Sequence, residues 1–174
     1  MEKTCYFGGG CFWCTEAIFK NISGVVSIFP GYMGGHVKNP SYKKVCEGNT
    51  GHAEVIKIEY DSSIISFKDL LSVFFSTHDP TTLNRQGNDI GKHYRSIVFH
   101  SNQEEEKIIL EYIKKINSSI FDNKIVTEVK KFEAFYLAEE YHQDYFKLNE
   151  DQPYCKFVIS PKVTKARKQL FKYY

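Results

Sequence analysis

Three consecutive glycines, residues 8–10, separate a strand-like stretch from a helix-like one and constrain how the N-terminal part folds. Residues 3–7 have the pattern of a short strand. After the glycines, Cys11, Cys14 and Ile18 share one face of a predicted helix. Because glycine adopts unusual backbone dihedrals and lets the backbone approach a ligand closely, the sequence predicts a tight strand-to-helix turn that ends at Cys11.

The Cys11 thiol is therefore predicted to lie at the start of a helix, at the positive end of the helix dipole. That setting lowers the pKa of a cysteine and favours a nucleophilic thiolate. The alternative is that Cys11 and Cys14 are small buried apolar residues of a core helix. Taken alone, this stretch fits both interpretations.

The size and charge of the chain exclude several broad classes. Its 174 residues suit one domain with a sizeable core, and its net charge of +2 gives no reason to expect a nucleic-acid partner. No apolar run is long enough for a membrane span, and residues 1–5 lack the apolar core of a secretion signal. We therefore expect a cytoplasmic protein, in which five cysteines favour free or redox-active thiols over a disulfide framework.

Strand-like and helix-like segments alternate along the chain. The predicted strands are residues 3–7, 25–29, 54–60, 96–100 and 124–131. The predicted helices begin near residues 11, 67 and 104, one helical turn lies at 41–46, and a further helix covers about 138–147. Residues 156–174 carry six Lys and Arg but no Asp or Glu, which favours a solvated tail with one short helix. This order predicts an α/β or α+β domain of two layers.

Glu54 heads a strand whose two faces differ. Ile56, Ile58 and Tyr60 share its face, which is the more apolar of the two. We therefore expect Glu54 to point inward, where burial would raise its carboxyl pKa and make it a candidate proton donor. The alternative is that Glu54, at the end of its strand, simply reaches water.

Cys11 and Cys14 form a C-x-x-C pair, which occurs in thiol–disulfide oxidoreductases and as half of a structural zinc site. A zinc-stabilised binding module is the weaker reading, because no second pair of ligands has the required spacing. Phe12 and Trp13 occupy the centre of the pair, where two bulky rings beside a thiol suggest an apolar pocket for a small substrate group. The alternative for both rings is packing in the core.

Eight short motifs, in their order and spacing, resemble the peptide methionine sulfoxide reductase A family. The resemblance covers about residues 4–160. The motifs are Gly10-Cys11-Phe12-Trp13, Gly31-Tyr32-Met33-Gly34-Gly35, Asn39-Pro40-Ser41-Tyr42, Thr50-Gly51-His52-Ala53-Glu54, His78-Asp79-Pro80, Arg85-Gln86-Gly87-Asn88-Asp89, Tyr94-Arg95-Ser96 and Ala138-Glu139-Glu140-Tyr141-His142-Gln143.

The resemblance implies a two-layer α/β sandwich with a ferredoxin-like core wrapped by long coils, formed by residues 1–174 as a single domain. It implies reduction of the S epimer of methionine sulfoxide, free or in proteins, to methionine. It also implies thioredoxin as the reductant, and neither a metal, a flavin nor a nicotinamide in the protein. We expect a monomer whose other partners are its substrates, with no nucleic-acid or membrane partner.

Two residues match the family's reacting groups. Cys11 matches the nucleophile, whose attack on the sulfoxide sulfur leaves a sulfenic acid. Glu54 matches the acid that delivers a proton to the sulfoxide oxygen, which is a poor leaving group without one. This role agrees with the inward-facing position that the strand pattern predicts for Glu54.

Five further residues match the family's binding positions. Tyr42 and Tyr94 match tyrosines whose hydroxyls help to bind the sulfoxide oxygen. Asp89 matches an acidic residue that supports the site through hydrogen bonding. Phe12 and Trp13 match the pocket for the S-methyl group of the substrate, where two rings would discriminate a methyl group from polar groups.

The resolving thiol, which condenses with the sulfenic acid, varies within the family. Cys14 lies one helical turn from Cys11, and Cys155 lies in the expected tail, residues 150–174. We expect Cys14 to resolve first, with Cys155 as a second thiol in a relay. The two remaining cysteines, which we expect to be inert, are Cys5 and Cys46.

Overall fold

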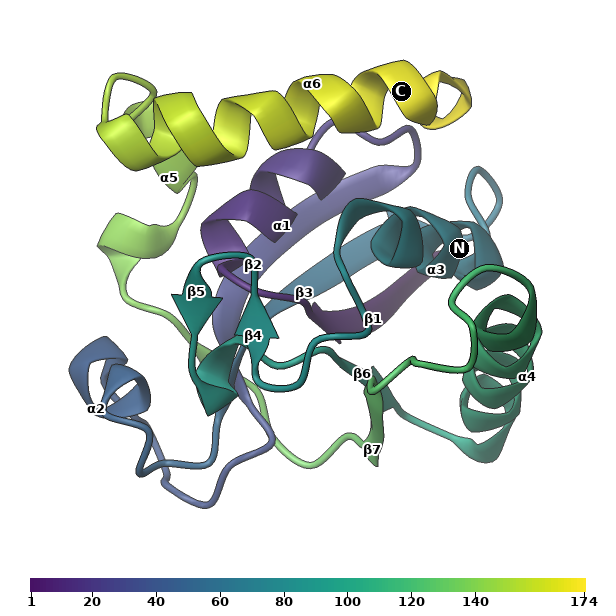
Figure 1. Cartoon of the computed structure of the whole chain (residues 1–174), viewed down its shortest axis with the longest axis horizontal. Coiled ribbons are helices and arrows are strands. Elements are labelled where there is room, and N and C mark those ends of the chain that lie inside the picture. The colour runs from purple at the N-terminus through teal and green to yellow at the C-terminus, as the bar shows by residue number, and fades with distance from the viewer.

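Six strands form one mixed sheet in the computed structural model, which describes residues 1–174 (Figure 1). Their order across the sheet is β7-β6-β1-β3-β2-β8, and only β6 and β7 run parallel to each other. The strands are β1 (Glu2–Gly8), β2 (Val25–Met33), β3 (Ala53–Asp61), β6 (Ile97–His100), β7 (Glu128–Lys131) and β8 (Tyr136–Leu137). A separate hairpin pairs β4 (Arg85–Gln86) with β5 (Asp89–Ile90).

Six α-helices and four short helical turns accompany the sheet. The helices are α1 (Phe12–Phe19), α2 (Tyr42–Cys46), α3 (Phe67–Thr77), α4 (Gln103–Ser119), α5 (Tyr145–Leu148) and α6 (Ser160–Gln169). The turns are η1 (Lys92–Tyr94), η2 (Glu140–His142), η3 (Cys155–Ile159) and η4 (Phe171–Tyr173). None of these helices is long and apolar enough to cross a membrane.

A ferredoxin-like unit forms the centre of the molecule. The elements β1, α1, β2, β3, α3 and β6 follow one another as βαββαβ, and their strands lie in the order β6-β1-β3-β2. The predicted two-layer architecture with a ferredoxin-like core is thus confirmed. Both helices begin as their sequences indicate, and α3 has a capping box in which Ser66 and Asp69 bond each other's backbone N–H groups.

The core lies on both faces of the sheet. On the face covered by α1 and α3, the rings of Phe7 and Phe74 stack with centroids 4.9 Å apart. A smaller apolar cluster on β2, β3 and β6 includes Val55 and Phe99. Burying each such large side chain contributes about 1.5–3 kcal/mol. As a result β3 is buried on both sides along its first half, which places Glu54 deep in the protein.

β2 is longer than predicted, because it continues through Pro30 to Met33. A proline interrupts a strand only where its missing N–H is needed for pairing. Pro30 still contributes its carbonyl, which accepts a hydrogen bond from the Ala138 N–H at 3.0 Å. Pairing with β8 begins at the next residue, Gly31. The predicted strand over 124–131, in contrast, is shorter in the structure and begins only at Glu128.

The helix predicted over 138–147 is wrong. In its place the chain forms the turn η2 and the short helix α5, directly after β8. The break lies at Asp144, whose φ of 55° is left-handed and cannot continue a helix. This conformation is held from outside the segment, because the Asp144 N–H donates to the Glu16 carboxylate at 3.0 Å.

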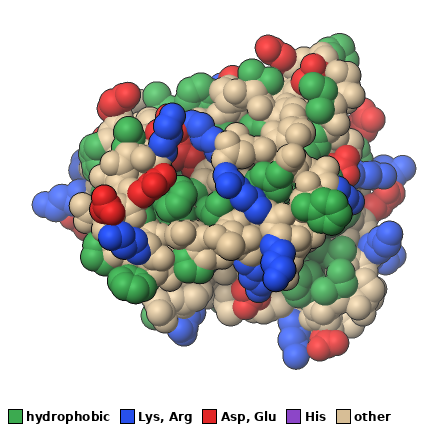
Figure 2. All heavy atoms as spheres, turned by 90° about the horizontal axis from the view of Figure 1, so that it is seen from above, with side chains coloured by type: hydrophobic (Ala, Val, Ile, Leu, Met, Phe, Trp, Pro, Cys, Tyr) green, Lys and Arg blue, Asp and Glu red, His purple; other side chains and the backbone are tan.

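The prediction of a solvated tail is also wrong, because residues 150–174 pack against the domain as η3 and α6, and α6 contacts α1 (Figure 1). Their buried side chains recur at helical spacing and are Cys155, Ile159, Val163 and Ala166. This apolar stripe was present in the sequence beneath the excess of basic residues. On the face of the molecule that carries α6, the basic side chains are dispersed among apolar and acidic ones (Figure 2).

Candidate functional site

Cys11 lies where the glycine turn meets helix α1, as predicted, and its backbone is the N-cap of that helix. The turn requires glycine at position 10, where φ is 90° and an added Cβ would come within 2.7 Å of the Gln86 side chain. The thiol is nearly enclosed, with Cys11 only 7% exposed. The sequence therefore folds locally so that a buried sulfur lies at a helix terminus.

Glu54 is buried beside this helix start. Its Oε2 accepts a hydrogen bond from the Phe12 N–H at 3.0 Å, and the residue is 2% exposed. Burial raises the pKa of the Glu54 carboxyl to about 8, assisted by the charges of Asp89 and Cys14 and opposed by the Phe12 N–H. The carboxyl thus holds its proton at neutral pH while it remains linked to the peptide that follows Cys11.

The expected lowering of the Cys11 pKa is not found. Burial raises the pKa of the Cys11 thiol well above its usual range, and the neighbouring Cys14 and Glu54 raise it further. The Trp13 N–H at the helix start does lower it, as the dipole argument requires. Desolvation is the larger effect here, because the thiol is almost completely removed from water.

Phe12 and Trp13 belong to one aromatic cluster, built on helix α1 and the segment of η2 and α5. The Phe12 ring lies 6.5 Å from Tyr42 and 5.1 Å from His142, between ring centroids. The Trp13 indole stacks on Tyr145 at 3.7 Å, and its Nε1–H donates to Nδ1 of His142 at 3.0 Å. Both rings are thereby held in place, with Phe12 fully buried and Trp13 partly exposed.

Tyr42 and Tyr94 are brought to the same site from α2 and η1. Both are half-buried, and burial followed by the negative charge of Glu54 raises the pKa of each phenol. Their hydroxyls are therefore neutral hydrogen-bond donors over the physiological pH range. The shared influence of Glu54 on both tyrosines is consistent with the predicted grouping around its carboxyl.

Asp89, on β5, is linked to the site by Tyr154, a residue that no sequence pattern indicated. Its Oδ2 accepts a hydrogen bond from the Tyr154 hydroxyl at 2.7 Å. The same hydroxyl lies 3.7 Å from Sγ of Cys14, and Nζ of Lys162 lies 3.9 Å from that sulfur. Tyr154 and Lys162 come from the C-terminal segment, so only its packing against α1 brings them to Cys14.

The two candidate resolving cysteines differ in environment. Cys14 is buried, yet the pKa of its thiol is lowered, chiefly by Cys11, with Lys162 and Tyr154 adding to the effect against desolvation. Cys155 is fully buried, and burial raises the pKa of its thiol, with Cys14 as the next cause. All five cysteines of the structure are free. Cys14 is therefore the more readily ionised of the two.

One group of side chains is close enough to suggest a metal centre. Donor atoms of Cys46, Glu54 and His93 lie within 4.8 Å of one another. A structural zinc site needs four protein ligands, and these three would leave it one short. The group does not include Cys11 or Cys14, so the C-x-x-C pair is not part of a preformed ligand set.

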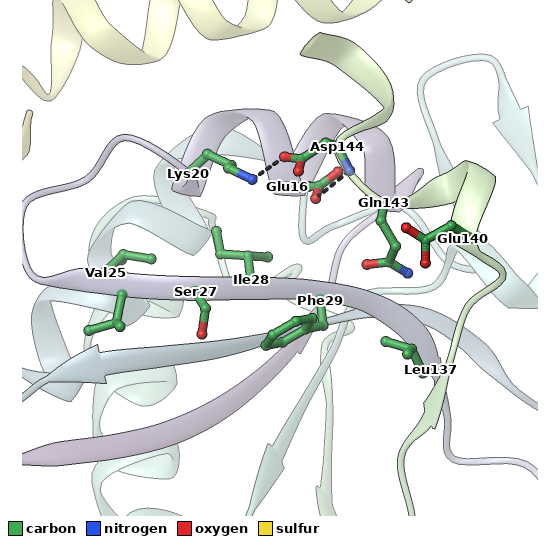
Figure 3. Close-up of a pocket in the computed structure, with 11 residues that line it drawn as sticks. Glu16, Lys20, Val25, Ser27, Ile28, Phe29, Leu137, Glu140, Gln143 and Asp144 are labelled. Carbon is green, nitrogen blue, oxygen red and sulfur yellow. Dashed lines mark hydrogen bonds and ion pairs between the residues drawn. The ribbon is translucent and has the colours of Figure 1, made fainter. Parts of the chain in front are cut away.

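A cavity of about 330 Å³ lies between α1 and β2 (Figure 3). Glu16 points into it beside Asp144, which also pairs with Lys20. Burial raises the pKa of the Glu16 carboxyl to about 7, although the Asp144 N–H donates to it. Glu16 thus anchors the left-handed turn that precedes Tyr145, the residue stacked on Trp13.

Residues 3–173 match the family model described as peptide methionine sulfoxide reductase. The chain is 56% identical to "Peptide methionine sulfoxide reductase MsrA" of Saccharolobus solfataricus over 92% of this chain and 90% of that protein. It is 55% identical to the protein of the same description from Sulfolobus acidocaldarius, over 92% and 91% of the two chains.

Solved structures agree with these matches. The crystal structure of reduced Mxr1 from Saccharomyces cerevisiae is similar with a TM-score of 0.84 and 34% identity, over 88% of this chain and 89% of that one. Methionine sulfoxide reductase A of Corynebacterium diphtheriae is similar with a TM-score of 0.76 and 33% identity, over 85% and 75%. Sequence and fold therefore point to the same group of proteins.

Proposed function

The chain belongs to the peptide methionine sulfoxide reductase family and is an oxidoreductase that reduces methionine sulfoxide, and we propose that Cys11, Glu54 and Cys14 carry the reaction. The observation that supports this most is the buried, protonated Glu54 carboxyl bonded to the peptide N–H adjoining Cys11. The proposed substrate is the S epimer of methionine sulfoxide, free or within a protein.

In the proposed first step the Cys11 thiol loses its proton to solvent, and the resulting thiolate attacks the sulfur of the sulfoxide. Glu54 gives its proton to the sulfoxide oxygen. The protonated oxygen is then transferred to the Cys11 sulfur as the sulfur–oxygen bond of the substrate breaks. Methionine leaves, Cys11 becomes a sulfenic acid, and Glu54 is left as a carboxylate. A carboxyl pKa of about 8 suits this role, because the Glu54 carboxyl is protonated at neutral pH and can act as the proton donor.

We propose that four aromatic side chains hold the substrate. The hydroxyls of Tyr42 and Tyr94 donate to the sulfoxide oxygen, where negative charge is concentrated. Phe12 and Trp13 provide the apolar surface for the S-methyl group, as their fixed rings beside Cys11 support. Asp89 supports the site indirectly, through its hydrogen bond with Tyr154.

We propose that Cys14 resolves the sulfenic acid by forming a disulfide with Cys11, and that Cys155 takes part in a later exchange. Support for this order is the lowered pKa of the Cys14 thiol and the raised pKa of Cys155. Thioredoxin is the proposed reductant. Mxr1, which is similar to this chain, has also been crystallised in complex with Trx2.

Residues 1–174 are proposed to act as one catalytic domain, because residues 150–174 supply groups that contact Cys14. A cytoplasmic location and a monomeric state remain predictions from the sequence. A thiol–disulfide oxidoreductase acting on protein disulfides is not favoured, because disulfide exchange needs no buried proton donor at Glu54.

Mass spectrometry of the protein after one turnover, with no reductant added, tests the assignment. We expect one equivalent of methionine and a Cys11–Cys14 disulfide. A protein that releases methionine but holds only a Cys11–Cys155 disulfide would overturn the proposed order. A protein that releases no methionine yet reduces the disulfides of insulin would instead support the oxidoreductase alternative.

A further inference from the structure

The ammonium group of Lys162 lies beside the second cysteine of the site. Its Nζ is 3.9 Å from Sγ of Cys14. No carboxylate lies within ion-pair distance of Lys162, whereas other lysines of the chain, such as Lys20 and Lys57, pair with acidic side chains. Its positive charge is therefore not neutralised by a neighbour and acts on Cys14.

Lys162 is held in this position by the packing of its helix. It lies in the first turn of α6, and the next residue, Val163, is buried together with Ala166 one turn later. The preceding turn η3 is anchored by Ile159, which is completely buried. The side chain itself is only partly exposed, so its ammonium approaches Cys14 from a fixed element.

The other polar neighbour of Cys14 is the Tyr154 hydroxyl, whose hydrogen is already used in a hydrogen bond. The Tyr154 hydroxyl lies 3.7 Å from the Cys14 sulfur but donates its single hydrogen to Asp89 at 2.7 Å. In this arrangement the Tyr154 oxygen can accept a hydrogen bond from the thiol but cannot donate one to a thiolate. Lys162 is then the cationic donor available to a negatively charged Cys14.

We propose that Lys162 is a positioning residue for the resolving step, holding Cys14 as the thiolate that attacks oxidised Cys11. This inference rests on the proposed function, in which Cys14 is the resolving thiol. The Cys14 thiolate attacks the sulfur of the Cys11 sulfenic acid, the Sγ–Sγ bond forms, and the Cys11 sulfur–oxygen bond breaks. The departing hydroxide takes a proton from solvent and leaves as water.

The contrast among the buried cysteines supports this role. Burial raises the pKa of the thiols of Cys5 and Cys155, neither of which has a lysine within hydrogen-bond distance. Cys14 is nearly as buried, yet its thiol pKa is lowered, first by Cys11 and then by Lys162. The influence of Cys11 changes once its thiol is oxidised, whereas that of Lys162 persists into the step in which Cys14 must act.

Single-turnover kinetics without reductant test the proposal in a Cys155→Ser background, where Cys14 is the one proposed resolving thiol that remains. Methionine release and disulfide formation are followed separately from about pH 6 to about pH 10. We expect Lys162→Met to leave the rate of methionine release unchanged. We expect it to slow disulfide formation about tenfold at neutral pH and to raise the apparent pKa of that step by about 1.

Two matched variants identify the charge as the cause. Lys162→Arg keeps the positive charge and should restore most of the rate of disulfide formation. Lys165→Met removes an exposed lysine of the same helix and should leave both steps unchanged. A purely structural role for Lys162 would slow disulfide formation equally at all pH values and would not shift its apparent pKa.

A measurement independent of catalysis separates this inference from the function on which it rests. In a Cys11→Ser protein, which is inactive under the proposed function, the Cys14 pKa is followed by thiolate absorbance and alkylation rate. A higher Cys14 pKa in the Lys162→Met form supports the effect of Lys162 on the Cys14 thiolate, and it is measured whether or not the proposed reaction occurs. An unchanged Cys14 pKa and an unchanged pH profile of disulfide formation would overturn it.

Discussion

The Phe12 N–H lies 3.0 Å from Oε2 of Glu54, so the first peptide of helix α1 is bonded directly to the buried carboxyl on β3. This bond joins the residue after Cys11 to the proposed proton donor, although 42 positions separate them in sequence. It restrains the two proposed reacting groups relative to each other before a substrate binds. Such preorganisation is what transfer of a proton during nucleophilic attack requires.

Replacing Glu54 by Gln should remove the proton that the sulfoxide oxygen needs. We expect the rate of methionine release in a single turnover to fall by about 10² to 10⁴, the usual contribution of a general acid. Glu59→Gln, on the same strand but at its partly exposed end, is the matched control and should keep the wild-type rate. A wild-type rate in the Glu54 variant would exclude this mechanism.

The raised pKa of Glu54 also predicts how stability changes with pH. The carboxyl titrates near pH 8 in the folded protein and near about pH 4.3 when unfolded, so between these values only the folded form keeps the proton. The unfolding free energy should therefore decrease as pH rises through this window, with a slope of about 1.4 kcal/mol per pH unit from this group.

Denaturant unfolding of the wild type and of Glu54→Gln at several pH values measures this contribution. The variant cannot ionise, so we expect its stability relative to wild type to increase from about pH 4.3 to about pH 8 and then to level off. Glu16, whose carboxyl pKa is also raised, is present in both proteins and cancels in the difference. A difference that does not change with pH would contradict the assigned burial penalty.

Loss of the two candidate resolving thiols should have unequal effects. We expect Cys14→Ser to slow thioredoxin-dependent turnover by about tenfold or more. The variant lacks the thiol that lies one helical turn from Cys11 and can react with it intramolecularly. Cys155→Ser should slow turnover less. Both variants should still release methionine in the first turnover, which quenched-flow sampling can measure. A larger effect of Cys155→Ser would reverse the proposed order of the two thiols.

The two tyrosine hydroxyls should contribute to the reaction through the sulfoxide oxygen. Removing one of them, by Tyr42→Phe or Tyr94→Phe, should lower kcat/KM about tenfold, equivalent to about 1.4 kcal/mol of lost hydrogen bonding in the transition state. Tyr112→Phe, on helix α4, where the Tyr112 ring packs against Phe75, serves as the control. Unchanged kcat/KM in both active-site variants would remove the tyrosines from the proposed set.

The glycine before Cys11 should tolerate no side chain. Gly10→Ala must accept a φ of 90° and also a Cβ within 2.7 Å of Gln86, so we expect it to destabilise the fold by more than about 1–2 kcal/mol. Gly48→Ala meets a similar φ of 80° with no atom within 4 Å, and it isolates the cost of the dihedral. Equal losses of stability in thermal unfolding would show that contact with Gln86 is unimportant.

Local patterns determined much of the fold. The alternation over residues 54–60 predicted the inward direction of Glu54, and the helix predicted to begin near residue 67 is α3. The resemblance of the eight motifs identified the family that the comparisons then confirmed. These features were accessible because each depends on neighbouring residues or on short motifs.

The failures have a common physical origin in contacts between distant segments. Nothing near Asp144 signals its left-handed turn, because the carboxylate that holds its N–H belongs to Glu16. The apolar stripe of residues 155–166 was hidden by the basic side chains between its members. The helix-dipole argument for Cys11 failed because burial, which depends on the whole fold, is the larger effect on the pKa of its thiol.

By itself the sequence determined that a C-x-x-C pair and two aromatic rings follow the glycine turn, and that a glutamate at the head of a distant strand points inward. Only the tertiary structure decided how the two thiols differ. Docking of α6 on α1 places Lys162 and Tyr154 at Cys14, while Glu54 and desolvation act on Cys11. The reason is that a thiol pKa depends on solvent exposure and on charges within a few ångströms, and both are supplied by segments far away in the chain.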